Sequence, residues 1–141
     1  MDDEPAAEMA RFFQTAIIVE DDALISDDLA AMCAEFGVRV LSVHRSADDA
    51  TAAITRDRPD YVLMDVRIRG KRDGIDIANA VHAAGVESRI VYITASTEGA
   101  TLDRIEADHP YRVLIKPIAP DDLAAALRLQ GGAGGPGGPP A

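Results

Sequence analysis

The chain has 141 residues, 48% of them hydrophobic, and a formal net charge of -10. This length corresponds to about one ordinary domain around a single core, and the negative charge would repel a phosphate backbone, so nucleic-acid binding is not expected. Because the acidic start lacks an apolar signal region and no later stretch is apolar for long enough to cross a membrane, the sequence predicts a cytoplasmic protein with no membrane partner.

The two ends of the chain differ in composition from the rest. The stretch "GGAGGPGGPPA" at residues 131–141 is rich in glycine and proline, which predicts a disordered tail. Residues 1–13 are expected to be a flexible N-terminal segment, although "EPAAEMARFF" could form a short helix whose Phe12 and Phe13 touch the body. One folded domain is therefore predicted over residues 14–130.

Between these ends, short runs rich in β-branched and aromatic residues alternate with stretches of helical apolar spacing. The short runs are typical of strands and lie at residues 15–19, 38–43, 61–64, 89–94 and 111–115. The helical stretches follow them at residues 23–36, 47–57, 74–85, 98–108 and 120–129. Five strand and helix units in alternation predict an α/β fold with a five-stranded parallel sheet and helices on both faces.

Residues at the expected helix boundaries support these assignments. Ser46 and Asp73 can each cap the helix that follows, and Pro120 stands at a favourable first position. Cys33, the only cysteine, lies in the first helix among apolar neighbours, so a buried side chain is expected in place of a disulfide or a nucleophile. The apolar stripe of that helix is expected to consist of Leu24, Ile25, Leu29, Met32, Cys33 and Phe36, with Gly37 as the stop.

Polar side chains stand at the ends of four of the five strands. Glu20 and Asp21 follow the first strand, Asp65 follows the third, Thr94 ends the fourth and Lys116 follows the fifth. In a parallel sheet these ends meet at one edge, where ligands bind. Three carboxylates brought together would repel one another, and oxygen ligands of this kind favour Mg²⁺ as the ion between them. With the lysine opposite, the set is suited to phosphorylation of Asp65.

The acidic triplet at residues 20–22 has a simpler explanation as well. Asp21 or Asp22 could cap the first helix, and alone that would account for the run. The acid after the third strand and the lysine after the fifth favour a functional site instead. Glu20 and Asp21 are therefore assigned to a metal, and Asp22 to the start of the helix.

Four motifs in this order resemble the receiver domain of bacterial two-component response regulators over residues 15–130. "IIVEDD" is similar to the acidic motif of the family, "YVLMDVRI" to its phosphoacceptor strand, "ITAS" to its switch hydroxyl, and "LIKP" to its phosphate-contacting lysine. The resemblance implies a flavodoxin-like sheet of order 2-1-3-4-5. It also implies that Asp65 is the phosphoacceptor, that Thr94 is the switch hydroxyl, and that Lys116 contacts the phosphoryl group and is often followed by a cis proline.

Arg67, two residues after the acceptor, occupies a position with two implied roles. Its backbone carbonyl would complete a metal site with Glu20, Asp21 and Asp65, and its side chain would overhang the phosphoryl group. Together with Ser96, it is hypothesised to control the access of water and hence the lifetime of the phosphoryl group. The basic cluster of Arg67, Arg69, Lys71 and Arg72 is interpreted as a solvated loop in preference to a docking patch.

The chain departs from the common receiver pattern in two places. Arg69 stands where many receivers have proline, and Gly74 lies nine residues after Asp65, one more than in the commonest form, which is interpreted as a variant loop. Val113 replaces the aromatic residue that usually reports the switch. Tyr111 could share the face of Val113 by strand alternation.

The resemblance implies a stand-alone response regulator, a phosphoacceptor signalling protein that is not an enzyme with an external substrate. It would use Mg²⁺, accept a phosphoryl group from a sensor histidine kinase or a histidine phosphotransfer protein, and switch its contacts with an unknown protein target. Charged side chains in residues 98–108, 111–115 and 120–129 could supply ion pairs to a homodimer, but exposed charges are expected on these segments in a monomer too.

Three alternatives stay open at this stage. A magnesium-dependent phosphohydrolase would usually carry a second aspartate where this chain has Arg67. A flavin or nucleotide binder would need a phosphate-binding loop after the first strand, where "EDDALIS" presents carboxylates. A receiver-like scaffold that works without phosphorylation is disfavoured by the intact site residues, but Val113 and the variant loop are compatible with it.

Overall fold

The computed structural model describes residues 14–67, 73–95 and 111–131. Within them, strands and helices alternate as the sequence predicts, except that the last two strands are separated by residues 96–110, which are not described. The elements are β1 (Gln14–Val19), α2 (Ala23–Glu35), β2 (Val38–His44), α3 (Ala47–Asp57), β3 (Tyr61–Asp65), α4 (Gly74–Ala83), β4 (Arg89–Thr94), β5 (Tyr111–Ile115) and α6 (Pro120–Gly131). The predicted helix at residues 98–108 lies outside the described residues.

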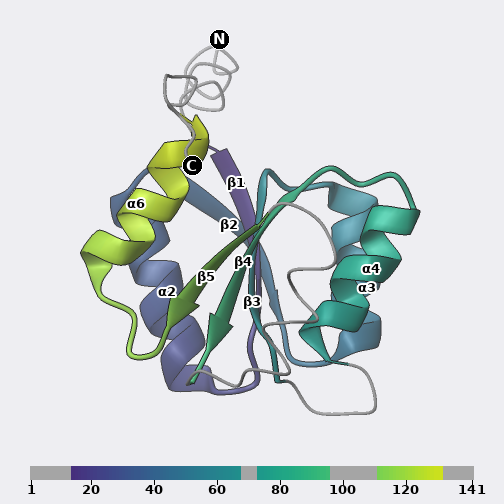
Figure 1. The fold of residues 1–141 in the computed structure, drawn as a ribbon, viewed down its shortest axis with the longest axis horizontal. Coiled ribbons are helices and arrows are strands. Elements are labelled where there is room, and N and C mark those ends of the chain that lie inside the picture. The colour runs from purple at the N-terminus through teal and green to yellow at the C-terminus, as the bar shows by residue number, and fades with distance from the viewer. Residues whose placement is uncertain (1–13, 68–72, 96–110, 132–141) are drawn as a thin grey trace, which may run out of the picture.

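The five strands form one parallel sheet in the order β2-β1-β3-β4-β5. Helices α2 and α6 cover one face and α3 and α4 cover the other (Figure 1). The predicted fold class, sheet order and two-sided arrangement are therefore confirmed. Because the order reverses between β1 and β3, their carboxyl ends flank a crevice of the kind that binds ligands in doubly wound sheets.

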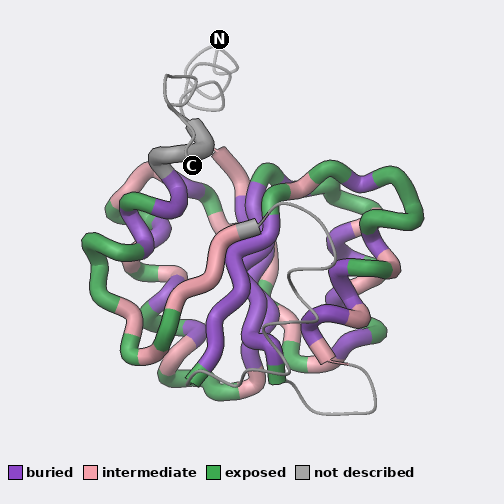
Figure 2. Tube along the Cα trace, viewed as in Figure 1, coloured by how far each residue is buried: buried purple, intermediate pink, exposed green. Residues whose placement is uncertain are grey.

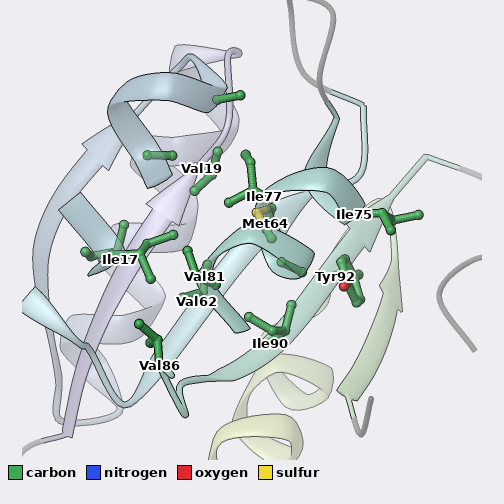
Figure 3. Packing of buried hydrophobic residues seen from close by; sticks show 14 of the residues in the cluster. Ile17, Val19, Val62, Met64, Ile75, Ile77, Val81, Val86, Ile90 and Tyr92 are labelled. Atoms are coloured by element: carbon green, nitrogen blue, oxygen red, sulfur yellow. The ribbon is translucent and has the colours of Figure 1, made fainter. Parts of the chain in front are cut away.

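Two apolar clusters hold the helices on the sheet, and the central strands β1, β3 and β4 are mostly buried between them (Figure 2). The cluster under α3 and α4 includes Met64, Ile75, Ile77 and Tyr92, which Figure 3 shows packed together with their neighbours. The cluster under α2 and α6 includes Cys33, which is fully buried, as expected. Burial raises the pKa of the Cys33 thiol to about 12, so this thiol is inert at neutral pH.

The helix starts follow the predicted capping residues. The side chain of Asp22 accepts hydrogen bonds from the backbone N–H groups of Leu24 and Ile25, and Ser46 caps α3 in the same way. Asp73 forms a reciprocal capping box with Asp76 at the start of α4. The boundaries of α2, α3 and α4 are thus explained by local hydrogen bonds.

One residue of the predicted apolar stripe does not face the core. Leu24 is 77% exposed, whereas Leu29 and Cys33 are buried and Ile25 packs against their cluster. Leu29 comes five positions after Leu24, and at about 100° per residue this offset places them on different sides of the helix. The assignment of Leu24 to the packing stripe was therefore wrong.

None of the described helices is both long enough and apolar enough to cross a bilayer. The assigned limits of the domain, residues 14–130, and the assigned character of residues 1–13 and 131–141 stay predictions, since residues 1–13 and 132–141 lie outside the described part of the chain.

Candidate functional site

The predicted site residues meet at the carboxyl edge of the sheet. Glu20 directly follows β1, and its N–H donates to the carbonyl of His44 at the end of β2. Asp65 ends β3 and pairs in register with Ile93, the residue before Thr94. The N–H of Lys116 donates to the carbonyl of Thr94 at 2.8 Å, which joins the ends of β4 and β5. Parallel pairing thus brings together residues that are far apart in the sequence.

Three carboxylates form the centre of this site. Glu20, Asp21 and Asp65 each offer an oxygen, and these oxygens all lie within 4.8 Å of one another. Glu20 is 2% exposed and Asp65 is 7% exposed, whereas Asp21 is half-buried. Negative charge is therefore concentrated where water can screen it only from one side.

Lys116 lies against these acids. Its Nζ donates to Oδ2 of Asp65 at 2.9 Å and lies 3.4 Å from Oε1 of Glu20. Burial alone would lower the pKa of Lys116, but the hydrogen bond and charge of Asp65, together with Glu20, outweigh it and raise the pKa. The lysine is therefore charged at neutral pH and offsets part of the negative charge.

The second oxygen of Asp65 is held by the backbone of the following loop. The N–H of Arg67 donates to Oδ1 of Asp65 at 2.8 Å. Two donors from different elements thus fix the carboxylate of Asp65, one at each oxygen. A carboxylate oxygen has more than one acceptor site, so these bonds leave lone pairs for a further ligand.

The burial of the Glu20 carboxylate is only partly compensated by its neighbours. Burial, followed by the charge of Asp65, raises the pKa of Glu20 to about 7, although the N–H of Asp22 and the charge of Lys116 oppose the shift. In the described part of the chain, Oε1 of Glu20 is buried without a hydrogen-bond partner, because the 3.4 Å approach of Lys116 lacks hydrogen-bond geometry. A buried carboxylate oxygen without a partner is a candidate ligand for a cation.

The chemistry of the donor set fits a hard divalent cation. All three side chains offer carboxylate oxygens, and Lys116, which contacts Asp65 and Glu20, brings one positive charge to them. Oxygen ligands that are few in number suit Mg²⁺, which keeps several waters. Asp22 does not belong to this cluster, because its side chain caps α2. The acidic run is thus divided as the sequence predicted.

Several predicted features lie at the margin of the described residues or beyond them. The structure does not describe Ser96, Arg69, Lys71 and Arg72. The hypothesis that Arg67 and Ser96 control the access of water and the interpretation of the basic cluster as a solvated loop therefore stay untested. The structure places the N–H of Arg67 on Asp65, and a metal-binding role for its carbonyl stays a prediction. Lys116 and Pro117 are joined by a cis peptide bond, in line with the resemblance.

Sequence reasoning missed two contacts at this site. The hydrogen bond from Arg67 to Asp65 is donated by the backbone N–H, so the identity of the side chain at residue 67 does not predict it. Gly74 was interpreted only through its spacing from Asp65 and as the start of a helix, yet it lies directly against the backbone carbonyl of Asp65. The position of a glycine immediately after a helix cap was the available signal for such a close approach.

Comparison with known proteins supports a single family. Residues 16–128 match the family model of the response regulator receiver domain. The chain is 33% identical over 113 residues to the transcriptional regulatory protein PdtaR of Mycobacterium tuberculosis, an alignment that covers 80% of this chain and 54% of that protein. It is 29% identical over 127 residues to the phyllosphere-induced regulator PhyR of Methylorubrum extorquens, with coverages of 89% and 46%. The chain thus spans about half the length of these curated relatives.

Solved structures show the same relationship. The signal receiver domain of a modulated diguanylate cyclase from Desulfovibrio desulfuricans has a TM-score of 0.76 at 31% identity, with coverage of 83% of this chain and 92% of that one. The receiver domain of a sensor histidine kinase from Pseudomonas aeruginosa has a TM-score of 0.72 at 25% identity, with coverages of 82% and 94%. That structure contains a magnesium ion coordinated in the active site cleft.

Proposed function

Because the chain belongs to the response regulator receiver family, a family of phosphoacceptor signalling modules, we propose that it accepts a phosphoryl group on Asp65 and thereby switches its contacts with other proteins. The observation that carries this proposal is the placement of Asp65. Its carboxylate lies at the carboxyl edge of the sheet, within 4.8 Å of two other acids and 2.9 Å from Lys116.

The proposed donor is the phosphohistidine of a sensor histidine kinase or a histidine phosphotransfer protein. A carboxylate oxygen of Asp65 attacks the phosphorus, a phosphorus–oxygen bond forms, and the phosphorus–nitrogen bond breaks. Its electron pair returns to the imidazole, which then takes up a proton. Lys116 stays beside the acceptor and offsets the negative charge of the transferring group.

Glu20, Asp21 and Asp65, with the backbone carbonyl of Arg67, are the proposed ligands of Mg²⁺. The magnesium ion in the related kinase receiver supports this assignment, as does the buried oxygen of Glu20. When bound, Mg²⁺ would supply positive charge that lowers the repulsion between the acids and the incoming phosphoryl group. The three acids make the surroundings of the acceptor negatively charged, which favours the binding of a cation there.

Thr94 is proposed to report the modification. It is buried at the end of β4, one residue beyond the partner of Asp65, so its hydroxyl can donate to a phosphoryl oxygen after a short movement. The signal would pass to an unknown protein target, and a homodimer through residues 98–108, β5 and α6 is one output of this kind. As receivers typically do, the protein would work in the cytoplasm.

The test is phosphorylation by acetyl phosphate, with and without Mg²⁺, followed by intact-protein mass spectrometry. We expect one phosphate adduct that requires Mg²⁺ and is absent from Asp65→Asn. Asp60→Asn is the matched control, because Asp60 lies at the opposite end of β3 with Thr15 as its hydrogen-bond partner. A wild-type protein that takes up no phosphate, or an adduct that persists in Asp65→Asn, would overturn the proposed function.

A further inference from the structure

Gly74, the first residue of α4, lies against the backbone of the acceptor residue. Its N–H donates to the carbonyl of Val66 at 2.9 Å. A Cβ atom at this position would lie 2.6 Å from the backbone carbonyl oxygen of Asp65 and 3.2 Å from Cα of Val66. Real Cβ atoms do not come this close to a carbonyl oxygen, so no side chain fits at residue 74 without a shift of the backbone.

The requirement for glycine here concerns space and not backbone conformation. Gly37 and Gly85 have positive φ values of 80° and 86°, whereas Gly74 has a φ outside the left-handed region. Alanine would therefore be acceptable to the local conformation of α4, and would even favour the helix. Alanine is excluded because its Cβ would collide with the backbone carbonyl of Asp65.

Neither side of this contact can retreat easily. The capping box of Asp73 and Asp76 fixes the start of α4. Ile75 and Ile77 are 2% and 0% exposed, and Figure 3 shows Ile77 beside Met64 of β3. The strand is held in turn, because the N–H of Val66 donates to the carbonyl of Ile93 at 3.0 Å. A methyl group at residue 74 must therefore displace the start of the helix or the Asp65–Val66 peptide.

A displaced peptide would move the carboxylate of Asp65 relative to its partners. Lys116 and the N–H of Arg67 hold that carboxylate at 2.9 Å and 2.8 Å, and the oxygens of the three acids lie within 4.8 Å of one another. Reactions at such sites are sensitive to shifts of about 1 Å, which can lower a rate by about a hundredfold. The packing of the start of α4 against β3 therefore helps to position the carboxylate of Asp65.

We propose that Gly74 is a positioning residue for the phosphoacceptor: by lacking a side chain, it lets the first turn of α4 seat against the backbone of Asp65 and fix the carboxylate for phosphoryl transfer and metal binding. This inference rests on the proposed function. It assigns to the start of α4 a role in placing the acceptor carboxylate.

Gly74→Ala is tested against Gly85→Ala, which makes the same chemical change at a remote position. Gly85 is exposed, and a Cβ there would meet no atom within 4 Å, although its φ of +86° makes alanine strained. Both variants should lose some stability. We expect the acetyl phosphate rate constant at saturating Mg²⁺ to fall by about tenfold or more in Gly74→Ala, and to stay within about twofold of wild type in Gly85→Ala. The Mg²⁺ dissociation constant should rise in Gly74→Ala alone.

Each rate is compared at equal concentrations of folded protein, as measured by urea titration. If Gly74→Ala matches Gly85→Ala in both rate and Mg²⁺ affinity, the positioning role is overturned. Wild-type protein in the same series separates the two proposals. An unphosphorylated wild type overturns the proposed function, whereas a phosphorylated wild type beside an equally active Gly74→Ala overturns the positioning role alone.

A second pair of variants decides the question if Gly74→Ala does not fold. Ile75→Ala weakens the packing of the start of α4 without adding a side chain there. Ile54→Ala is its control, because it removes the same atoms from α3 in the same apolar cluster. Positioning through the start of α4 predicts a rate several-fold lower in Ile75→Ala than in Ile54→Ala. Equal rates in this pair would overturn the inference.

Discussion

Glu20 illustrates the conflict between stability and function at the level of one residue. Its carboxyl is 2% exposed and faces Asp65, with Lys116 and the N–H of Asp22 as the compensating groups and half-buried Asp21 beside it in the cluster. These partners do not balance burial, because the pKa of Glu20 is raised to about 7. Without a metal, ionisation of this residue opposes folding.

Replacement of Glu20 by glutamine should reveal this conflict as a pH dependence. The pKa of Glu20 in the folded protein, about 7, lies above its ordinary value of 4.5, so its favourable contribution is present below pH 4.5 and is lost as the pH rises through 7. From pH 5 to pH 8, we expect the unfolding free energy of the wild type in EDTA to fall relative to Glu20→Gln by on the order of 2 kcal/mol. Urea titrations of both proteins at four pH values measure this difference in unfolding free energy.

Glu35→Gln is the control for this experiment, since Glu35 is exposed on α2. Its unfolding free energy should follow that of the wild type at every pH. Parallel curves for wild type and Glu20→Gln would show that Glu20 titrates normally in the folded protein, contrary to this expectation.

At the level of elements, a buried hydroxyl joins the acceptor strand to the last helix. The hydroxyl of Tyr61, the first residue of β3, donates to the carbonyl of Leu127 in α6 at 2.6 Å. Tyr61 is 1% exposed and Leu127 is 5% exposed, so water cannot replace this bond. The contact ties α6 to the strand that ends in Asp65.

Tyr61→Phe removes the hydroxyl and leaves the ring in place. We expect a loss of about 1–2 kcal/mol in unfolding free energy, because one buried hydrogen bond disappears while its carbonyl acceptor stays buried. Ser42→Ala is the comparison, since it deletes a hydroxyl that contacts His44 at 2.8 Å in half-buried surroundings on the edge strand β2. That change should alter stability by less than about 0.5 kcal/mol. Equal losses in the two variants would contradict the assignment of Tyr61 as a connection between elements.

The elements also show what a sequence can predict about structure. Strands β4 and β5 begin and end where predicted, because runs of β-branched and aromatic residues suit a buried strand. The caps Ser46 and Asp73 were predictable, since a cap acts on residues next to it in sequence. Leu24 was assigned to the wrong side of α2 because its apolar character outweighed its phase in the helix.

The site could be predicted in part for a similar reason. Strand ends identify which side chains meet, so the cluster of Glu20, Asp21, Asp65 and Lys116 was expected. The order of the sheet came from the resemblance to receivers and not from strand composition. The glycine after the helix cap signalled that a close approach was possible there, but spacing along a chain does not determine which atom lies within a few ångström, so the contact with Asp65 was missed.

On the scale of the whole molecule, the net charge of -10 opposes compaction, and any salt should relieve part of this repulsion. A specific Mg²⁺ site must be distinguished from that general effect. The comparison is therefore between MgCl₂ and NaCl at equal ionic strength. The three acids at the sheet edge predict an additional increase in stability for MgCl₂ alone.

For the wild type, we expect near-saturating Mg²⁺ to add on the order of 1–3 kcal/mol beyond the effect of NaCl, because the ion binds the folded state selectively. This corresponds to a rise of several degrees in Tm, measurable by differential scanning calorimetry. Asp21→Asn should lose the magnesium increment and keep the NaCl effect, since Asp21 is half-buried in the cluster. Asp27→Asn, on the exposed surface of α2, should keep both. If MgCl₂ and NaCl stabilise the wild type equally, the acids act only through their general charge and do not form a metal site.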